Sequence, residues 1–170
     1  MKLYTKRLTL IPLSLTQFSI YLQNPVMLEK AMGLRPSGHP IPAYARQAME
    51  WHYWMAAEQP DAFLWFTNWQ IIWTAENRSV GYACFQGPPA APAQMVELGY
   101  HIHLPYRRNG YMTEAACKLC DWALEQPMVR GVFAQTELGN YPSEGVLQRC
   151  GMKLEHAGDG IGCWVKYKSQ

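Results

Sequence analysis

The stretch Met95–Glu125, MVELGYHIHLPYRRNGYMTEAACKLCDWALE, constrains the fold more than any other part of the chain. It begins with alternating apolar and polar residues, breaks at Pro105 and resumes with helical spacing after Gly110. The pattern predicts a strand, a short basic turn and a helix. The first N–H groups of a helix lack partners within it, and the helix dipole adds positive charge there, so such a turn suits a phosphate or pyrophosphate. Arg107 and Arg108 in the turn strengthen that interpretation.

The turn reads RRNGYM, which fits the opening of the pattern Gln/Arg-x-x-Gly-x-Gly/Ala. It resembles the coenzyme A pyrophosphate loop of the GNAT superfamily of N-acetyltransferases. The run Gly110 to Ala115 is similar to the branch with the ribosomal-protein N-terminal acetyltransferases, although Met112 stands where the family usually has Gly or Ala. The resemblance implies acetyl-CoA as the cofactor, and it implies these residues as the phosphate cradle: Arg107, Arg108, Asn109, Gly110, Tyr111, Met112 and Thr113. A solvated basic turn before an amphipathic helix is the alternative.

A second motif begins at Asn140 and reads NYPS, followed by VLQRCGM. It resembles the Asn-x-x-Ser/Ala opening of the family's last helix and its closing Gly-Phe, with Met152 in place of Phe. In the family these residues contact the pantetheine part of the cofactor, so Asn140 and Ser143 are carried over as cofactor-binding candidates. Asn140 is also a good helix N-cap, and capping alone is the alternative.

Glu97 is the first candidate for a catalytic base. Period-two geometry places it on the same strand face as Gly99 and His101. Aminolysis of a thioester requires a neutral amine, so a carboxylate or imidazole within reach helps by taking a proton. His101 and His103 compete for that role, and an exposed or salt-bridged carboxylate is the structural alternative for Glu97. The resemblance also places the backbone from Tyr100 to His103, including Ile102, beside the pantetheine amides.

The family's usual general acid is missing, because Leu147 stands where many members have a Tyr. A thiol has a pKa near 8.5, so a thiolate is a tolerable leaving group at neutral pH and an acid is useful rather than obligatory. Ser143 is the nearest replacement, and Tyr141 is a weaker one.

Composition limits the other classes of function. A chain of 170 residues, 49% of them apolar, fits one domain spanning 1–170. The net charge of +2 does not suggest nucleic-acid binding, and the N-terminus lacks the apolar run of a signal peptide. We therefore expect a cytoplasmic protein without a membrane span. Five cysteines indicate reduced thiols, and Cys117 and Cys120 have the spacing of one helical turn, so no metal site is expected.

The order of elements predicts an α/β domain with the GNAT fold, a mixed central sheet of about seven strands flanked by four helices. Strands are expected at 8–12, 64–73, 79–87, 95–104, 131–136, 152–156 and 163–168, and helices at 14–22, 43–58, after 110 and at 140–149.

The aromatic residues of the early helix and strand, Tyr44, Trp51, Tyr53, Trp54, Trp65, Trp69 and Trp73, allow two interpretations. A Trp stripe on a strand is more often core than the wall of an acceptor cleft. If part of it lines the cleft, the acceptor carries an apolar or aromatic group.

The sequence therefore predicts an acetyl-CoA-dependent N-acetyltransferase that transfers the acetyl group directly to an amine, because no cysteine is matched with a histidine as an activated nucleophile. The amine is a protein N-terminus or a small molecule, and the protein is a monomer or homodimer. The alternative is a binding module that keeps the acyl-CoA site without turnover.

Overall fold

The structure is a computed structural model that describes residues 1–169. Its strands are β1 (Leu3–Tyr4), β2 (Leu8–Pro12), β3 (Trp69–Trp73), β4 (Arg78–Phe85), β5 (Met95–Ile102), β6 (Gly131–Glu137), β7 (Lys153–Gly158) and β8 (Ile161–Tyr167). Its α-helices are α1 (Leu15–Gln23), α2 (Pro25–Ala31), α3 (Ala43–Glu58), α4 (Phe63–Phe66), α5 (Tyr111–Glu125) and α6 (Tyr141–Arg149). Short 3-10 turns are η1 (Pro60–Ala62), η2 (Thr74–Glu76) and η3 (Leu104–Tyr106).

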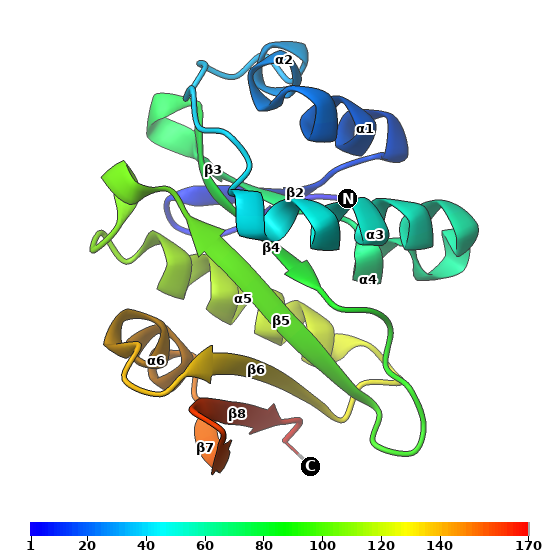
Figure 1. The fold of residues 1–170 in the computed structure, drawn as a ribbon, viewed down its shortest axis with the longest axis vertical. Coiled ribbons are helices and arrows are strands. Elements are labelled where there is room, and N and C mark those ends of the chain that lie inside the picture. Colours follow the sequence, from blue (N-terminus) through cyan, green and yellow to red (C-terminus); the bar gives the residue numbers. More distant parts are fainter. Residues whose placement is uncertain (170) are drawn as a thin grey trace.

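The strands form one sheet in the order β1-β2-β3-β4-β5-β6-β8-β7. Neighbouring strands are antiparallel except β5 and β6, which run parallel and pair only from Met95 to Glu97 with Gly131 to Phe133. Beyond that short ladder the two strands separate, as Figure 1 shows. The result is a wedge in the middle of the sheet, open between the last residues of β5 and those of β6.

Helices cover both faces of the sheet, with α5 behind β5 and α3 in front in the view of Figure 1. The sequence of α5 explains its place, because its apolar residues recur at three- and four-residue spacing. That stripe packs into the main core as Met112, Ala115, Ala116, Leu119, Cys120 and Ala123. A smaller core joins α1 and α3 to β4 through Phe18, Met49 and Tyr82.

The predicted α/β class and mixed sheet are confirmed, but the counts differ. Within residues 1–169 the sheet has eight strands instead of about seven, and there are six α-helices instead of four. The additional strand is β1. Helix α2 was not predicted, because a proline after an asparagine is a common signal for the end of a helix, here the helix predicted at 14–22. Asn24 does end α1, but its Oδ1 also accepts from the N–H groups of Val26 and Met27 and so caps the next helix, with Pro25 in the first turn.

The strand predicted for residues 64–73 is wrong in its first half. Phe63–Phe66 forms α4, and β3 begins only at Trp69. A short apolar run without clear alternation does not distinguish a strand from a helical turn. The turn lets Trp65 pack against Trp122, with ring centroids 5.0 Å apart, while Trp69 lies 5.1 Å from the same ring.

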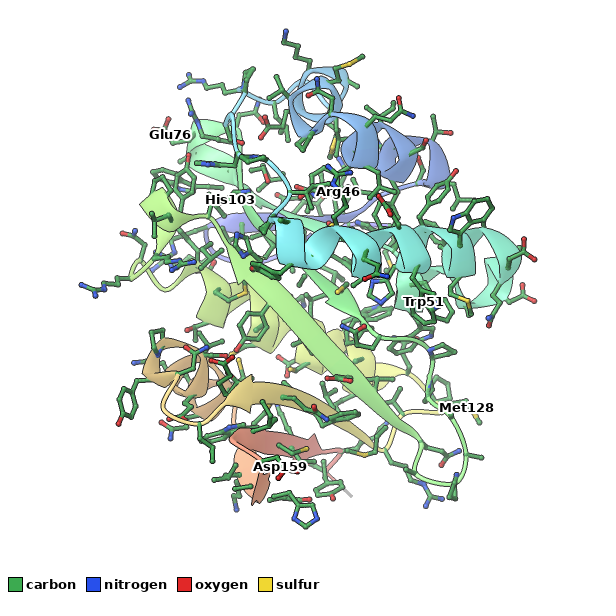
Figure 2. The ribbon with its side chains drawn as sticks, in the orientation of Figure 1. Arg46, Trp51, Glu76, His103, Met128 and Asp159 are labelled. Carbon is green, nitrogen blue, oxygen red and sulfur yellow. The ribbon has the colours of Figure 1, made fainter. Side chains whose placement is uncertain are left out.

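The core interpretation is therefore confirmed for Trp69, which is buried in the main cluster, and Trp65 and Trp73 are partly buried and pack against that cluster. Trp51 and Trp54 instead lie exposed on α3, and Figure 2 labels Trp51 there.

No helix within residues 1–169 is long and apolar enough to cross a membrane.

Candidate active site

The basic turn ends at the open N-terminus of α5. Arg108 and Gly110 have positive φ values of 63° and 76°, and Gly110 is the N-cap of the helix. Glycine adopts such a φ without steric cost, and it brings no side chain over the end of the helix. No side chain within residues 1–169 caps α5. The turn therefore presents the first backbone amides of a 15-residue helix together with two exposed arginines.

Glu114, in the first turn of α5, holds this end of the helix to the N-terminal segment. Its carboxylate accepts hydrogen bonds from Thr5 Oγ1 at 2.6 Å, from Arg7 N at 2.7 Å and from Arg7 Nε at 2.7 Å. Arg7 also donates from a terminal nitrogen to the carbonyl of Asn109 at 2.9 Å, and its guanidinium lies 4.6 Å from the centre of the Tyr111 ring. Arg7 thus connects the turn to β2 and to the helix.

Burial alone would raise the pKa of Glu114, but the hydrogen bonds from Thr5 and Arg7 outweigh it and the pKa lies below its ordinary value. Sequence reasoning missed this arrangement. The signal was present in two separate places, the Thr-x-Arg-Leu opening of the chain and the GYMTEA run that follows the turn.

The side chain of Met112 lies in the main core, as does that of Tyr111. The departure from Gly or Ala at position 112 therefore puts no bulk at the open end of the helix. Asn109 stabilises the turn from within, because its Nδ2 donates to the carbonyls of Tyr106 at 3.3 Å and Arg107 at 3.0 Å.

Tyr100 links β5 to α6 at the wedge. Its hydroxyl is hydrogen-bonded to Ser143 Oγ at 2.9 Å, and the Ser143 N–H donates to Asn140 Oδ1 at 3.4 Å. Asn140 is therefore the N-cap of α6. Burial raises the pKa of Tyr100 to about 12, so its phenol stays protonated at neutral pH. Sequence reasoning considered only the backbone of Tyr100. Leu147, at the family's usual Tyr position, is buried in the main core.

Glu97 is the last residue of β5 that pairs with β6, opposite Phe133, so the wedge opens directly after it. Its side chain is half-buried, and burial raises the pKa of the carboxyl above its ordinary value. Among residues 1–169 no group is hydrogen-bonded to this carboxylate. It is therefore available to accept a proton from a ligand.

His101 lies on the same strand face as Glu97, about 13 Å further along β5 at the usual rise per residue. Its Nδ1 is hydrogen-bonded to the Tyr44 hydroxyl at 2.8 Å, and its ring stacks on Tyr82 with centroids 5.2 Å apart. Burial, and then the charges of Arg107 and His39, lower the pKa of His101. With this separation, Glu97 and His101 do not both reach one reacting amine.

His103 follows β5 directly and is labelled in Figure 2. It is buried, and its ring stacks on that of His39 with centroids 4.5 Å apart. Burial, and then the neighbouring His39 and His101, lower the pKa of His103 to about 3. It is neutral at physiological pH and has the contacts of a packed residue.

Comparison with known proteins places this geometry in a family. The family described as an acetyltransferase (GNAT) domain matches residues 7–153. The chain belongs to the GNAT acetyltransferase family. An uncharacterized N-acetyltransferase, YjdG of Bacillus subtilis (strain 168), is 33% identical over 100 residues, which are 59% of this chain and 59% of that relative. The match with this curated relative therefore spans only about 59% of its length.

Solved structures share the GNAT fold over nearly the whole chain. The ribosomal-protein-S5-alanine acetyltransferase from Vibrio fischeri has a TM-score of 0.71 and 14% identity, covering 99% of this chain and 97% of its own. RimL, the ribosomal L7/L12 alpha-N-protein acetyltransferase solved in complex with coenzyme A, has a TM-score of 0.66 and 13% identity, covering 98% of each chain. The microcin C7 self-immunity acetyltransferase MccE, solved with acetyl-CoA and AMP, has a TM-score of 0.62 and 17% identity, covering 96% and 93%. At these identities the likeness establishes the fold.

In this GNAT domain the predicted site residues fall into three groups. The turn and first helical residues, from Arg107 to Thr113, form the open end of α5. Asn140 and Ser143 lie at the start of α6 and meet β5 through Tyr100. Glu97, His101, Ile102 and His103 follow one another along or just beyond the wedge side of β5. Within residues 1–169 no cluster of His, Cys, Asp and Glu side chains is arranged to hold a metal ion.

Proposed function

We propose that this GNAT chain is an acetyl-CoA-dependent N-acetyltransferase that moves the acetyl group directly to a primary amine. The observation that carries the proposal is the open N-terminus of α5 beside the wedge between β5 and β6. An uncapped helix end with adjacent arginines binds a phosphate group, and the unpaired edge of β5 offers backbone groups to an extended ligand. Both features occur in one site.

Coenzyme A would extend from the N-terminus of α5 into the wedge between β5 and β6. The backbone amides of Tyr111, Met112 and Thr113 and the charges of Arg107 and Arg108 would bind the pyrophosphate. The backbone of Ile102, with Asn140 and Ser143 across the wedge, would bind the pantetheine. His103 does not offer its backbone there, because its N–H donates to the Val80 carbonyl at 2.9 Å and its carbonyl accepts from the Tyr106 N–H at 2.9 Å. Acetyl-CoA, when bound, supplies an activated acetyl group.

Glu97 is proposed as the general base. It removes a proton from the amine, whose lone pair then forms the new N–C bond while the C–S bond breaks. A raised pKa brings the carboxyl closer to neutral pH and so makes it a better proton acceptor. His101 is the alternative base, since it is neutral, but its Nδ1 is already engaged by Tyr44.

Ser143 is proposed to donate its hydroxyl proton to the departing sulfur, and Tyr100 to replace that proton through the 2.9 Å hydrogen bond. Tyr100 then takes up a proton from water, and Glu97 releases to water the proton that it took from the amine. Tyr100 would thus act as a positioning residue through Ser143. Burial and then the charge of Glu97 raise the pKa of two nearby cysteines, Cys84 and Cys163, so both thiols are poor nucleophiles at neutral pH. The pKa of Cys84 rises to about 12. This supports direct transfer without an acyl-cysteine step.

The acceptor is proposed to approach over the front of β6, β8 and β7. Gln135 and Cys163 line a shallow hollow of about 370 Å³ there. Period two and the strand register place them on the same sheet face as Phe133, the partner of Glu97. The substrate is a small-molecule amine or a protein N-terminus; RimL and the S5-alanine acetyltransferase are named for ribosomal proteins.

The test measures coenzyme A binding by calorimetry and free thiol release from acetyl-CoA with a panel of aromatic amines, aliphatic amines and short peptides. We expect binding, and thiol release with at least one amine. The double variant Arg107→Ala, Arg108→Ala should weaken binding at least tenfold, because bonds to charged phosphate contribute about 1.5–3 kcal/mol each. Arg35→Ala is the control, since Arg35 is paired with Glu76 at η2. Binding without release for any amine would indicate the binding module, and no binding would overturn the site.

A further inference from the structure

Three of the five cysteines meet where α5 packs against the end of α6. Cys117 and Cys120 lie on α5, and Cys150 is the C-cap of α6. The Sγ atoms of Cys117 and Cys150 are hydrogen-bonded and lie 2.7 Å apart, although the residues are 33 positions apart in the chain. Cys150 Sγ also contacts the carbonyl of Thr113 at 3.7 Å. The proposed transfer reaction uses none of these thiols.

The two thiols of the pair differ in access and acidity. Cys117 is half-buried, whereas Cys150 is only 4% exposed. The hydrogen bond with the Cys150 thiol, and then the charge of Lys166, lower the pKa of Cys117. The same hydrogen bond, the one with Cys120 and burial raise the pKa of Cys150. Lys166 is held near by its ion pair with Asp121 at 3.0 Å. A reactive thiol is one that is acidic and accessible, which describes Cys117.

We propose that Cys117 and Cys150 form a reversible disulfide that joins α5 to the end of α6, with Cys117 as the attacking thiol and Cys150 as the resolving one. The inference rests on the placement of the two sulfur atoms and does not depend on the proposed transferase activity. The oxidant is a low-molecular-weight disulfide of the glutathione class.

The disulfide forms in two thiol–disulfide exchange steps. Cys117 thiolate attacks one sulfur of the oxidant, a mixed disulfide forms, and one thiolate leaves and takes up the proton that Cys117 lost. Once Cys117 is in the mixed disulfide, its thiol hydrogen bond, the largest cause of the raised pKa of Cys150, is gone. Cys150 then loses its proton and attacks the Cys117 sulfur of the mixed disulfide, and the second thiolate leaves and takes up that proton. Two protein thiols are oxidised by two electrons in total, and one oxidant disulfide is reduced to two thiols.

The disulfide would connect the two helices that flank the proposed cofactor site. The N-terminus of α5 carries the basic turn, and α6 begins at Tyr141, directly after its N-cap Asn140. Cross-linking residues this far apart in sequence restricts the unfolded chain, so the oxidised protein should melt roughly 5–15 °C higher than the reduced one. Dithiothreitol should reverse the shift.

The experiment incubates the purified protein with glutathione disulfide and measures intact mass and peptide masses. We expect the wild type to lose the mass of two hydrogen atoms and to yield a linked Cys117–Cys150 peptide. Cys150→Ala should instead accumulate a glutathione adduct on Cys117, because no resolving thiol remains. Cys117→Ser should form neither product at a comparable rate. Cys163→Ser is the matched control and should behave as the wild type.

The wild-type measurement requires no variant, so a folding defect in Cys150→Ala leaves it decisive. A wild type that gains a glutathione adduct but forms no internal disulfide would overturn the proposal. So would a linked peptide in which Cys120 replaces Cys117. Equal adduct formation in Cys117→Ser and in Cys150→Ala would refute the assignment of Cys117 as the attacking thiol.

Discussion

Replacing Glu114 by Gln tests whether the N-terminal segment holds the basic turn in place. The substitution keeps the size of the side chain and removes its charge. The amide oxygen can still accept from Thr5 and from the Arg7 backbone, but the amide nitrogen faces Arg7 Nε, so that two donors meet where an ion pair was. The substitution therefore changes only the charge and the hydrogen bonds of this side chain, and it leaves no cavity.

The expected loss follows from the contacts. A hydrogen bond to a charged group contributes about 1.5–3 kcal/mol, and the two remaining bonds lose about half of their strength when the acceptor becomes neutral. The Arg7 side chain is 39% exposed and that of Glu114 is 19% exposed, so solvent screening reduces the sum. We expect a loss of about 2–3 kcal/mol in the free energy of unfolding, or a Tm lower by roughly 4–12 °C for a chain of this length.

Thermal unfolding by circular dichroism measures this loss, and Glu76→Gln is the control. Glu76, labelled in Figure 2, forms an ion pair with Arg35 in which the side chains are 42% and 65% exposed. Such a pair contributes about 0–1 kcal/mol. Equal Tm values for the two variants would refute the reasoning. Coenzyme A affinity should also fall in Glu114→Gln alone, because Arg7 positions the Asn109 carbonyl of the turn.

The effect of Glu114 should depend on pH in a defined direction. Its pKa is lowered in the folded protein, so its contribution is fully present above the unfolded value of about 4.3 and is lost as pH falls through the folded value. The stability difference between wild type and Glu114→Gln should be constant from about pH 6 to 8 and should shrink below about pH 4. A difference that grows as the pH falls would contradict this assignment.

Three further substitutions test the proposed reaction. Glu97→Gln should lower the rate by ~10² near neutral pH with acetyl-CoA affinity unchanged, and the defect should shrink as pH rises toward the pKa of the amine; a constant defect would indicate positioning instead. Tyr100→Phe should lower kcat roughly tenfold at unchanged KM for acetyl-CoA, and an unaltered kcat would exclude the link through Ser143. Gly110→Val should leave the circular dichroism spectrum intact but weaken coenzyme A binding at least tenfold. A β-branched residue at a φ of 76° costs about 1–2 kcal/mol or more and shifts the turn. Loss of folding would show that Gly110 has a purely structural role.

The elements that follow from local pattern could be predicted from the sequence. The change from period two to helical spacing around Gly110 located β5, the turn and α5, and Asn140 marked the start of α6. Phe63–Phe66 could not be resolved in this way, because four apolar residues fit a strand and a helical turn equally well. The packing of Trp65 on Trp122 favours the helical turn at Phe63–Phe66, and Trp122 is too distant in the sequence for a local pattern to reveal that contact.

Residues of the candidate site that belong to one segment could be located from the sequence, whereas the contacts between distant segments could not. Arg7 and Glu114 are 107 positions apart, and Tyr100 and Ser143 are 43 positions apart, so no spacing rule connects either pair. The Met112 side chain points into the main core because of the way α5 is turned about its axis against the sheet, which the sequence of the turn does not show. The sequence therefore names residues of the candidate site, and the hydrogen bonds between them follow only from the structure.

The short parallel ladder between β5 and β6 has a consequence for how the molecule holds together. Within residues 1–169 the ladder that joins the five strands on one side to the three on the other has three residue pairs, from Met95 to Glu97, and α5 packs against strands on both sides. A ligand along the wedge would contact both halves at once and would add backbone pairing where the ladder stops. Coenzyme A bound to both halves would make their local opening less frequent. Amide hydrogen exchange of Leu98–Ile102 and of Ala134–Glu137 should therefore slow together when coenzyme A binds.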